Sequence, residues 1–235
     1  MSPPGTSKTQ PIDLQFWPTP NGQKISIMLE ELGVPYAVRF VAIGRGEQFK
    51  PAFLAISPNN RIPAIVDPDG PGGQPISIFE SGAILIYLGE KFGRFYPRDP
   101  RTRVAVNEWL IWQVANVGPI FGQNNHFRTY AREKLPYAIT RFINETHRLF
   151  GVLDKRLAAR EYVVGDYSIA DMALYPWMRN WGRRGIEIEE FGNVKRWHDA
   201  VAARPAVVKG VAIKAPVEID LATDEEAQRI MFGQR

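Results

Sequence analysis

The stretch from residue 61 to residue 92, RIPAIVDPDGPGGQPISIFESGAILIYLGEKF, decides the fold of the first half of the chain. Two runs with strand character, residues 62–66 and 75–79, flank the turn-forming segment DPDGPGG. Residues 81–92 follow at once and carry apolar side chains at helical spacing. This stretch therefore predicts an antiparallel hairpin followed by a helix.

The residues before this stretch alternate between element types. Residues 12–17 and 36–43 have strand character, and residues 24–32 between them have helical periodicity that ends at a glycine. Residues 47–56 predict a short helix, bent or broken near Pro51. The order is β-α-β-α-β-β-α, in which the first crossover requires a parallel strand pair. The expected fold class is a small mixed α/β sheet with helices packed on it.

The pattern changes after the linker FYPRDP at residues 95–100, because the rest of the chain is almost entirely helical in periodicity. The expected helices cover residues 102–125, 136–159, 169–181 and 194–203. Thr223 with Glu226 is a candidate cap for a short last helix. The predicted organisation is a disordered arm at 1–11, an α/β domain at 12–97, an all-helical domain at 98–215 and a tail at 216–235.

Composition excludes several classes of protein. The chain has 235 residues and no cysteine, which rules out disulfides, thiolate metal sites and a cysteine nucleophile. The net charge of +4 is spread along the chain and does not indicate nucleic-acid binding. No apolar run is long enough for a membrane span, and the polar start lacks the apolar core of a secretory signal.

Other patterns favour packing or turns over chemistry. The three histidines, His126, His147 and His198, lack metal-ligand spacing, so no metal is expected. The Gly44-x-Gly46 pair lacks the third glycine of a dinucleotide loop and is interpreted as a turn. Five tryptophans are interpreted as helix-packing core: Trp109, Trp112, Trp177, Trp181 and Trp197.

The segment WPTPNG, residues 17–22, lies between the first strand and the first helix. A strand-to-helix turn gathers unpaired backbone N–H groups at the positive end of a helix, which favours an anion such as a thiolate. Thr19 adds a hydroxyl donor, and Asn21 is either a second donor toward a ligand or the helix N-cap. The alternative is that Thr19 and Asn21 only cap the helix.

Two further segments point to a ligand. Pro63 at the start of a strand implies an edge, a turn or a cis bond, and a cis bond would expose the Ile62 backbone to an extended peptide. Glu80 and Ser81 bring an acid and a hydroxyl to a helix start, with Ser81 as a candidate N-cap. They suit a ligand that carries both an ammonium and a carboxylate. Glutathione meets all of these requirements.

At this point the chain resembles the cytosolic glutathione transferases, through SPNNRIPAI at 57–65, FESGAI at 79–84 and YSIAD at 167–171. Within that family it is most similar to the bacterial Nu class of glutathione-dependent disulfide-bond oxidoreductases, through PTPNG at 18–22, GRGEQF at 44–49, GQNNHF at 122–127 and PYAI at 136–139. The resemblance implies a thioredoxin-like N-terminal domain, an all-helical C-terminal domain, a homodimer, a cytoplasmic location and a cis bond at Pro63. YSIAD resembles the family's Ser-x-x-Asp capping box, which serves folding.

The resemblance also implies roles for single residues. Thr19 and Asn21 would lie at the glutathione sulfur, and the Ile62 backbone, next to Pro63, would pair with the cysteinyl unit. The remaining assignments are Gln48 and Arg61 near the glycyl carboxylate, Glu80 and Ser81 at the γ-glutamyl end, and Arg141 closing over the ligand. Asn124, Phe127 and Tyr137 are candidates for the acceptor pocket; the alternative is that Phe127 and Tyr137 are ordinary core residues. Other classes of the family use a Tyr, Ser or Cys near the end of the first strand, whereas this chain has Trp17 and Thr19 there and no cysteine. This difference argues against simple conjugation of glutathione.

The leading hypothesis is a reductase in which bound glutathione, activated by Thr19 and a helix N-terminus, attacks a disulfide. Reduction of organic hydroperoxides is a further expected activity. Glutathione acts as co-substrate, oxidised glutathione as product, and a small disulfide or an electrophile as the other partner. The alternatives are conjugation of glutathione to electrophiles and a non-catalytic interaction module of the same fold.

Overall fold

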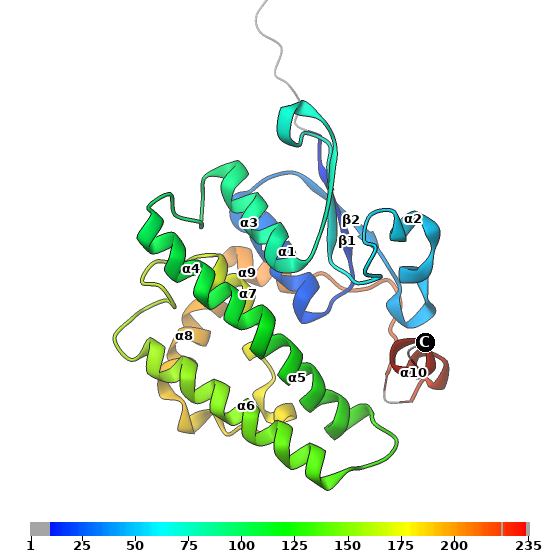
Figure 1. Cartoon of the computed structure of the whole chain (residues 1–235), viewed down its shortest axis with the longest axis vertical. Coiled ribbons are helices and arrows are strands. Elements are labelled where there is room, and N and C mark those ends of the chain that lie inside the picture. The colour runs from blue at the N-terminus through cyan, green and yellow to red at the C-terminus, as the bar shows by residue number, and fades with distance from the viewer. Residues whose placement is uncertain (1–9, 222, 234–235) are drawn as a thin grey trace, which may run out of the picture.

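The computed structural model describes residues 10–221 and 223–233. The arm expected at residues 1–11 falls mainly on residues 1–9, which lie outside the described residues. Figure 1 shows a sheet with its helices in the N-terminal part of the chain, next to a larger bundle of helices from the C-terminal part.

The described residues form a four-stranded sheet in the order β2-β1-β3-β4. Its strands are β1 (Ile12–Phe16), β2 (Tyr36–Phe40), β3 (Ala64–Asp67) and β4 (Ile76–Phe79). β1 pairs parallel to β2, with Ile12 opposite Tyr36, and β3 pairs antiparallel to β4, with Ala64 opposite Phe79. The mixed sheet and the hairpin are confirmed.

The helices of the N-terminal part are α1 (Pro20–Leu32), α2 (Pro51–Leu54) and α3 (Ser81–Phe92). α1 starts four residues earlier than expected, because Thr19 rather than Asn21 is its N-cap. The helix expected at 47–56 is broken at Lys50 into a 3-10 turn, η2 (Glu47–Phe49), and α2, since proline fits the first position of a helix but not its interior.

The C-terminal part contains α4 (Pro100–Trp112), α5 (Gly118–Asn125), α6 (Pro136–Leu157), α7 (Ile169–Met178), α8 (Gly192–Ala202) and α9 (Pro205–Val211). The single helix expected at 102–125 is interrupted by a π-helical turn, η4 (Gln113–Val117), and continues past α5 into a second one, η5 (His126–Tyr130). π-Helical turns inside α-helices often mark functional sites because they turn side chains out of register. α9 was not expected.

The start of α7 carries the predicted capping box. The Ser168 hydroxyl accepts from the Ala170 N–H, and the buried Asp171 carboxylate accepts from the Ser168 backbone, the Val163 backbone and the Trp197 indole. Burial raises the pKa of Asp171 to about 6, and these donors oppose that rise. The motif ties three segments of the helical part together and lies away from the cavities described below.

The C-terminal segment forms a last helix, α10 (Glu225–Phe232), as expected. Its cap is Asp224, whose side chain accepts from the Ala227 N–H, and not Thr223, whose hydroxyl donates to Asp220. Figure 1 shows α10 beside the loops of the N-terminal part near α2, apart from the helical bundle. It packs there on the 3-10 turn η1 (Ile43–Arg45).

The packing of the C-terminal segment on η1 requires a glycine at position 44. A Cβ on Gly44 would lie 2.9 Å from a methyl of Ile219 and 3.3 Å from the Cβ of Ala227. The C-terminal segment therefore approaches this turn too closely for a side chain. The fold class expected from the sequence, a thioredoxin-like part followed by an all-helical part, is confirmed.

Candidate functional site

Two cavities of about 300 Å³ each lie where the N-terminal and helical parts meet. We call one the polar cavity, because Lys24, Glu80, Ser81 and Gln113 line it. The other, the inner cavity, is lined by Thr19, Gln48, Tyr130 and Phe232 among others. Both are also lined by the same four residues, Asn21, Arg61, Ile62 and Trp177, so they are two parts of one cleft.

The start of α1 forms one wall of the cleft. The Thr19 hydroxyl oxygen accepts from the Gly22 N–H at 3.2 Å, which caps the helix. That oxygen still has its own hydrogen, so capping and donation to a ligand are compatible. Gly22 is required here, because a Cβ would lie 2.3 Å from the Trp17 carbonyl oxygen. The turn therefore combines a hydroxyl donor with the positive end of a helix.

Asn21 is held by a residue from the helical part. The Trp177 indole N–H donates to Asn21 Oδ1 at 2.9 Å. This bond fixes Oδ1 as the acceptor end of the Asn21 amide. Among the described residues, the Nδ2 group of Asn21 has no hydrogen-bond acceptor. Trp177 lines both cavities, so interpreting it as packing core alone was incomplete.

The sequence predicted Ser81 as the N-cap of α3, but Ser81 is the first residue inside the helix. Glu80 is at the N-cap position, and its side chain makes no capping hydrogen bond. The Ser81 hydroxyl oxygen instead accepts from the Lys24 ammonium at 3.1 Å, and the same ammonium donates to Gln113 Oε1 at 2.5 Å. The π-helical turn η4 begins at Gln113, whose Nε2 is buried without a partner. Lys24 thus joins α1 and α3 to the helical part.

Lys24 is only 1% exposed, which is rare for a lysine. Burial lowers its pKa from 10.5 to about 7, and the nearby Glu80 carboxylate partly offsets this. Lys24 is therefore near its titration point at neutral pH. An anion in the polar cavity would favour its charged form.

The loop before β3 forms the floor of the cleft. The Ile62–Pro63 bond is cis, as the resemblance implied, and Ile62 lines both cavities. Arg61 is exposed and, among the described residues, is not in an ion pair. Glu80 has φ of 68°, a left-handed conformation that non-glycine residues rarely adopt, and Asn59 Nδ2 donates to its carboxylate at 3.4 Å.

Gln48 and Arg141, both predicted at the ligand, have different positions in the structure. Gln48 lines the inner cavity, but its Nε2 donates to the Ile43 carbonyl, and its buried Oε1 accepts no hydrogen bond within the part of the chain that the structure describes. Arg141 is an exposed residue of α6 and lines neither part of the cleft. Of the predicted glutathione contacts, the structure therefore brings together all but Arg141.

The three residues expected in the acceptor pocket do not line the cleft. Asn124 is fully buried, and its Nδ2 donates to the Thr146 hydroxyl and the Arg184 carbonyl, so it holds the helical part together. Phe127 stacks on Phe142. Tyr137 is 80% exposed. All three belong to segments of the resemblance. Asn124 and Tyr137 line neither the cleft nor the neighbouring cavity described below, whereas Phe127 lines that neighbouring cavity.

Other aromatic residues line the inner cavity instead. They are His126 and Tyr130 from the π-helical turn η5 and Phe232 from α10. The sequence indicated these residues only weakly: His126 lies in the GQNNHF segment, Tyr130 follows it closely, and Phe232 lies in the expected last helix. Lys24 had a clearer signal, since it follows Asn21 by three residues and therefore shares its helix face.

Among the described residues there is no group of three or more histidine, cysteine, aspartate or glutamate side chains that could hold a metal ion. Within the same residues, no helix has the length and apolar character needed to cross a bilayer.

Comparisons with known proteins agree with this geometry. Residues 19–91 match the glutathione S-transferase N-terminal domain, and residues 141–205 match the C-terminal domain of the same family. The disulfide-bond oxidoreductase YfcG of Escherichia coli (strain K12) is 51% identical over 197 residues, which cover 83% of this chain and 92% of the relative. The disulfide-bond oxidoreductase YghU of the same organism is 42% identical, covering 85% and 74%.

Solved structures with the same fold contain glutathione. A glutathione transferase family member from Pseudomonas fluorescens pf-5, with two glutathione bound, has a TM-score of 0.83 and 44% identity, covering 88% of this chain and 95% of its own. A glutathione transferase from Pseudomonas putida, with one glutathione disulfide bound per subunit, has a TM-score of 0.84 and 42% identity, covering 90% and 95%. The chain therefore belongs to the glutathione S-transferase family.

Proposed function

We propose that the protein is a glutathione-dependent disulfide-bond reductase in which glutathione supplies every reacting sulfur. One observation carries the proposal. Three side chains on the cleft, Thr19, Asn21 and Ser81, have their acceptor oxygens occupied from inside the protein by N–H donors. Each already accepts a bond from inside the protein and keeps its own hydrogens available to donate to a ligand, and a cleft with such donors suits a thiolate and a carboxylate.

In this proposal the γ-glutamyl end of glutathione lies in the polar cavity. Its carboxylate accepts from the Ser81 hydroxyl and from N–H groups at the start of α3, and Lys24 behind Ser81 balances the charge. Its ammonium pairs with the exposed Glu80. The Ile62 backbone pairs with the cysteinyl unit, and Arg61 and Gln48 lie toward the glycyl carboxylate.

The thiol then lies between Thr19 and Asn21. A free thiol has a pKa of about 8.5 and is mostly protonated at neutral pH. Donation from the Thr19 hydroxyl, the Asn21 amide and the end of α1 stabilises the thiolate, and the thiolate is the nucleophile in exchange with disulfides. No cysteine of the chain takes part, since it has none.

The reaction balances with two glutathiones. The thiolate of the first attacks one sulfur of the substrate disulfide, forming a mixed disulfide while the original S–S bond breaks and the other sulfur leaves as a thiolate that takes a proton. A second glutathione thiolate attacks the glutathionyl sulfur of the mixed disulfide. This releases the second substrate thiol and glutathione disulfide. The relative with bound glutathione disulfide and the one with two bound glutathiones support this stoichiometry.

The test is a set of parallel initial rates at one glutathione concentration, with 2-hydroxyethyl disulfide, 1-chloro-2,4-dinitrobenzene and cumene hydroperoxide. We expect the highest kcat/KM with the disulfide. A higher value with the aryl chloride would instead support conjugation. Failure to bind a glutathione-affinity column, together with no rate on any of the three, would support the non-catalytic module. The homodimer and the cytoplasmic location implied by the resemblance stay predictions.

A further inference from the structure

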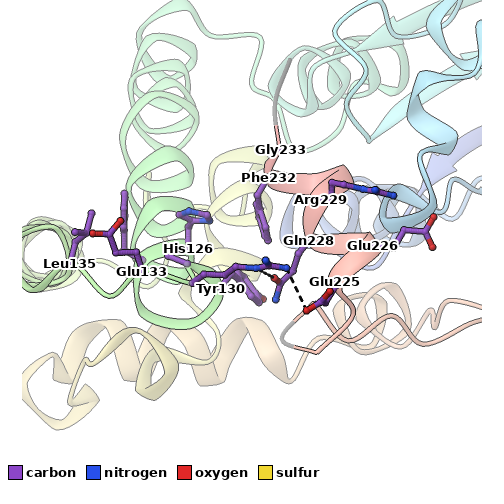
Figure 2. Close-up of a pocket in the computed structure, with 13 residues that line it drawn as sticks. His126, Tyr130, Glu133, Leu135, Glu225, Glu226, Gln228, Arg229, Phe232 and Gly233 are labelled. Carbon is purple, nitrogen blue, oxygen red and sulfur yellow. Dashed lines mark hydrogen bonds and ion pairs between the residues drawn. The ribbon is translucent and has the colours of Figure 1, made fainter.

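A third cavity, of about 880 Å³, lies next to the inner cavity, and we call it the outer cavity. Figure 2 shows its lining, which comes from η5 and the following loop on one side and from α10 on the other. His126, Tyr130 and Phe232 line both the inner and the outer cavity. These three residues therefore form a partition between the inner and the outer cavity. The proposed function involves the inner cavity but not the outer one.

The partition is built from ring contacts. Phe232 stacks on Tyr130 with ring centroids 5.4 Å apart and meets His126 edge to face at 4.9 Å. In Figure 2 the Phe232 ring reaches from α10 toward Tyr130 and His126. Such contacts fill the space by packing alone, so a smaller side chain at position 232 would leave an opening between the cavities.

The helix that carries Phe232 is attached at the surface. Arg45 pairs with Asp224 at 2.8 Å and with Glu226 at 3.6 Å, and Arg132 pairs with Glu225 at 3.8 Å. Ion pairs between exposed side chains stabilise weakly. The wall of the outer cavity is therefore held mainly by the close packing of Ala227 on Gly44 and by ring contacts, whereas the wall of the polar cavity is held by buried hydrogen bonds.

The outer cavity suits a peptide. Its lining combines aromatic rings with charges of both signs, among them Arg132, Arg229, Glu225 and Glu226. A peptide offers apolar side chains, backbone amides and charges of both signs, and the volume is in the range of sites for ligands of that size.

We infer that the outer cavity receives the peptide half of a glutathionylated cysteine peptide, and that Phe232 is the residue that controls its access. This rests on the proposed function. The substrate's glutathionyl half lies in the inner cavity, and the thiolate of the glutathione held in the polar cavity attacks its sulfur. The new S–S bond gives glutathione disulfide, the old one breaks, and the peptide leaves as a thiolate that takes a proton.

The experiment measures kcat/KM for a glutathionylated cysteine peptide and for 2-hydroxyethyl disulfide, and compares their ratio between variants. Phe232→Ala opens the partition and is expected to raise the ratio of peptide to small disulfide about tenfold. Phe232→Trp narrows it and is expected to lower the ratio. The matched control is Ile230→Ala, on the same helix at a residue that lines neither cavity, and it should leave the ratio at the wild-type value.

The outcomes separate the two claims. Wild-type turnover of 2-hydroxyethyl disulfide supports the proposed function whatever the ratio does. A ratio that does not respond to either Phe232 variant, or that rises equally in Ile230→Ala, would overturn the assignment of the outer cavity while leaving the reductase intact. Circular dichroism on each variant identifies loss of α10, and Phe232→Trp tests the claim without removing ring contacts.

Discussion

The polar cavity and the outer cavity flank the same inner cavity but are built in opposite ways. The polar cavity is lined by Lys24 and Ser81, both buried and bonded to each other, with Gln113 bonded to the same ammonium. One wall of the outer cavity is α10, which is held by ion pairs at the surface, by ring contacts and by the packing of Ala227 on Gly44. A buried charge must keep all its partners, whereas exposed pairs exchange with water at little cost. The first arrangement fixes one ligand, and the second tolerates several.

The largest effect is expected where the fixed region touches the reacting sulfur. Thr19→Val removes the hydroxyl donor and should lower kcat/KM for 2-hydroxyethyl disulfide about 10- to 100-fold, the value of one hydrogen bond to a charged group. Thr19→Ser keeps the hydroxyl and is the matched control. A larger loss of kcat/KM for 2-hydroxyethyl disulfide in Phe232→Ala than in Thr19→Val would contradict the difference drawn here between the polar and the outer cavity.

The next effect concerns the buried ammonium. Lys24→Met leaves Ser81 and Gln113 without their donor and should weaken glutathione binding about tenfold, measured by titration calorimetry. Lys50→Met changes an exposed lysine instead and should bind as the wild type does. Equal affinity in both variants would contradict the role given to Lys24.

The same variant should also change how stability depends on pH. The folded chain holds the pKa of Lys24 at about 7, against 10.5 for an unperturbed lysine, so between these values the unfolded chain binds more protons. The free energy of unfolding of the wild type should therefore rise with pH in this window, by at most about 1.4 kcal/mol per pH unit from this group. Urea unfolding at pH 7 and pH 9 should find a smaller rise in Lys24→Met.

A smaller effect is expected from the group that orients the Asn21 amide. Trp177→Phe keeps the ring but removes the N–H that bonds to Asn21 Oδ1, and it should lower kcat/KM about fivefold. Trp112→Phe is the control, because Trp112 packs on Trp109 and lines no part of the cleft. An unchanged rate in Trp177→Phe would mean that the indole packs without orienting the amide.

The smallest effect is expected at the attachment of α10. Asp224→Asn keeps the cap of the helix and removes the charge that pairs with Arg45, so kcat/KM for the small disulfide should change about twofold or less. Asp224→Ala removes the cap as well and should destabilise α10 further, measured by circular dichroism. A large loss in Asp224→Asn would show that this region is as strictly held as the polar cavity.

The elements that were predicted well are those specified by local chemistry. The hairpin follows from the DPDGPGG turn, the capping box from Ser168 and Asp171, and α3 from the helical spacing of apolar residues at 81–92. Thr19, Asn21 and Ser81 were found because they lie where a strand meets a helix, and such turns present donors to ligands. Ser81 was wrong as an N-cap, and of the two roles left open for Asn21 the N-cap belongs instead to Thr19. The oxygens of Asn21 and Ser81 accept from side chains distant in the sequence.

The acceptor residues were placed only in part, for a physical reason. Phe127 lines the outer cavity, but Asn124 and Tyr137 do not line it. Asn124 and Phe127 lie in a helix whose register changes at π-helical turns, and a single extra residue per turn rotates the following side chains to another face. The sequence pattern does not reveal these turns, so it does not tell which side chains of this segment face the cavity.

The sequence by itself determined the class of fold, the order of its elements and the donors at the two helix starts, because each depends on residues a few positions apart. Only the tertiary structure decided that Lys24 is buried, that Trp177 reaches Asn21 and that α10 closes the inner cavity. These contacts join residues up to 156 positions apart, and their partners are chosen by packing, which local pattern does not encode.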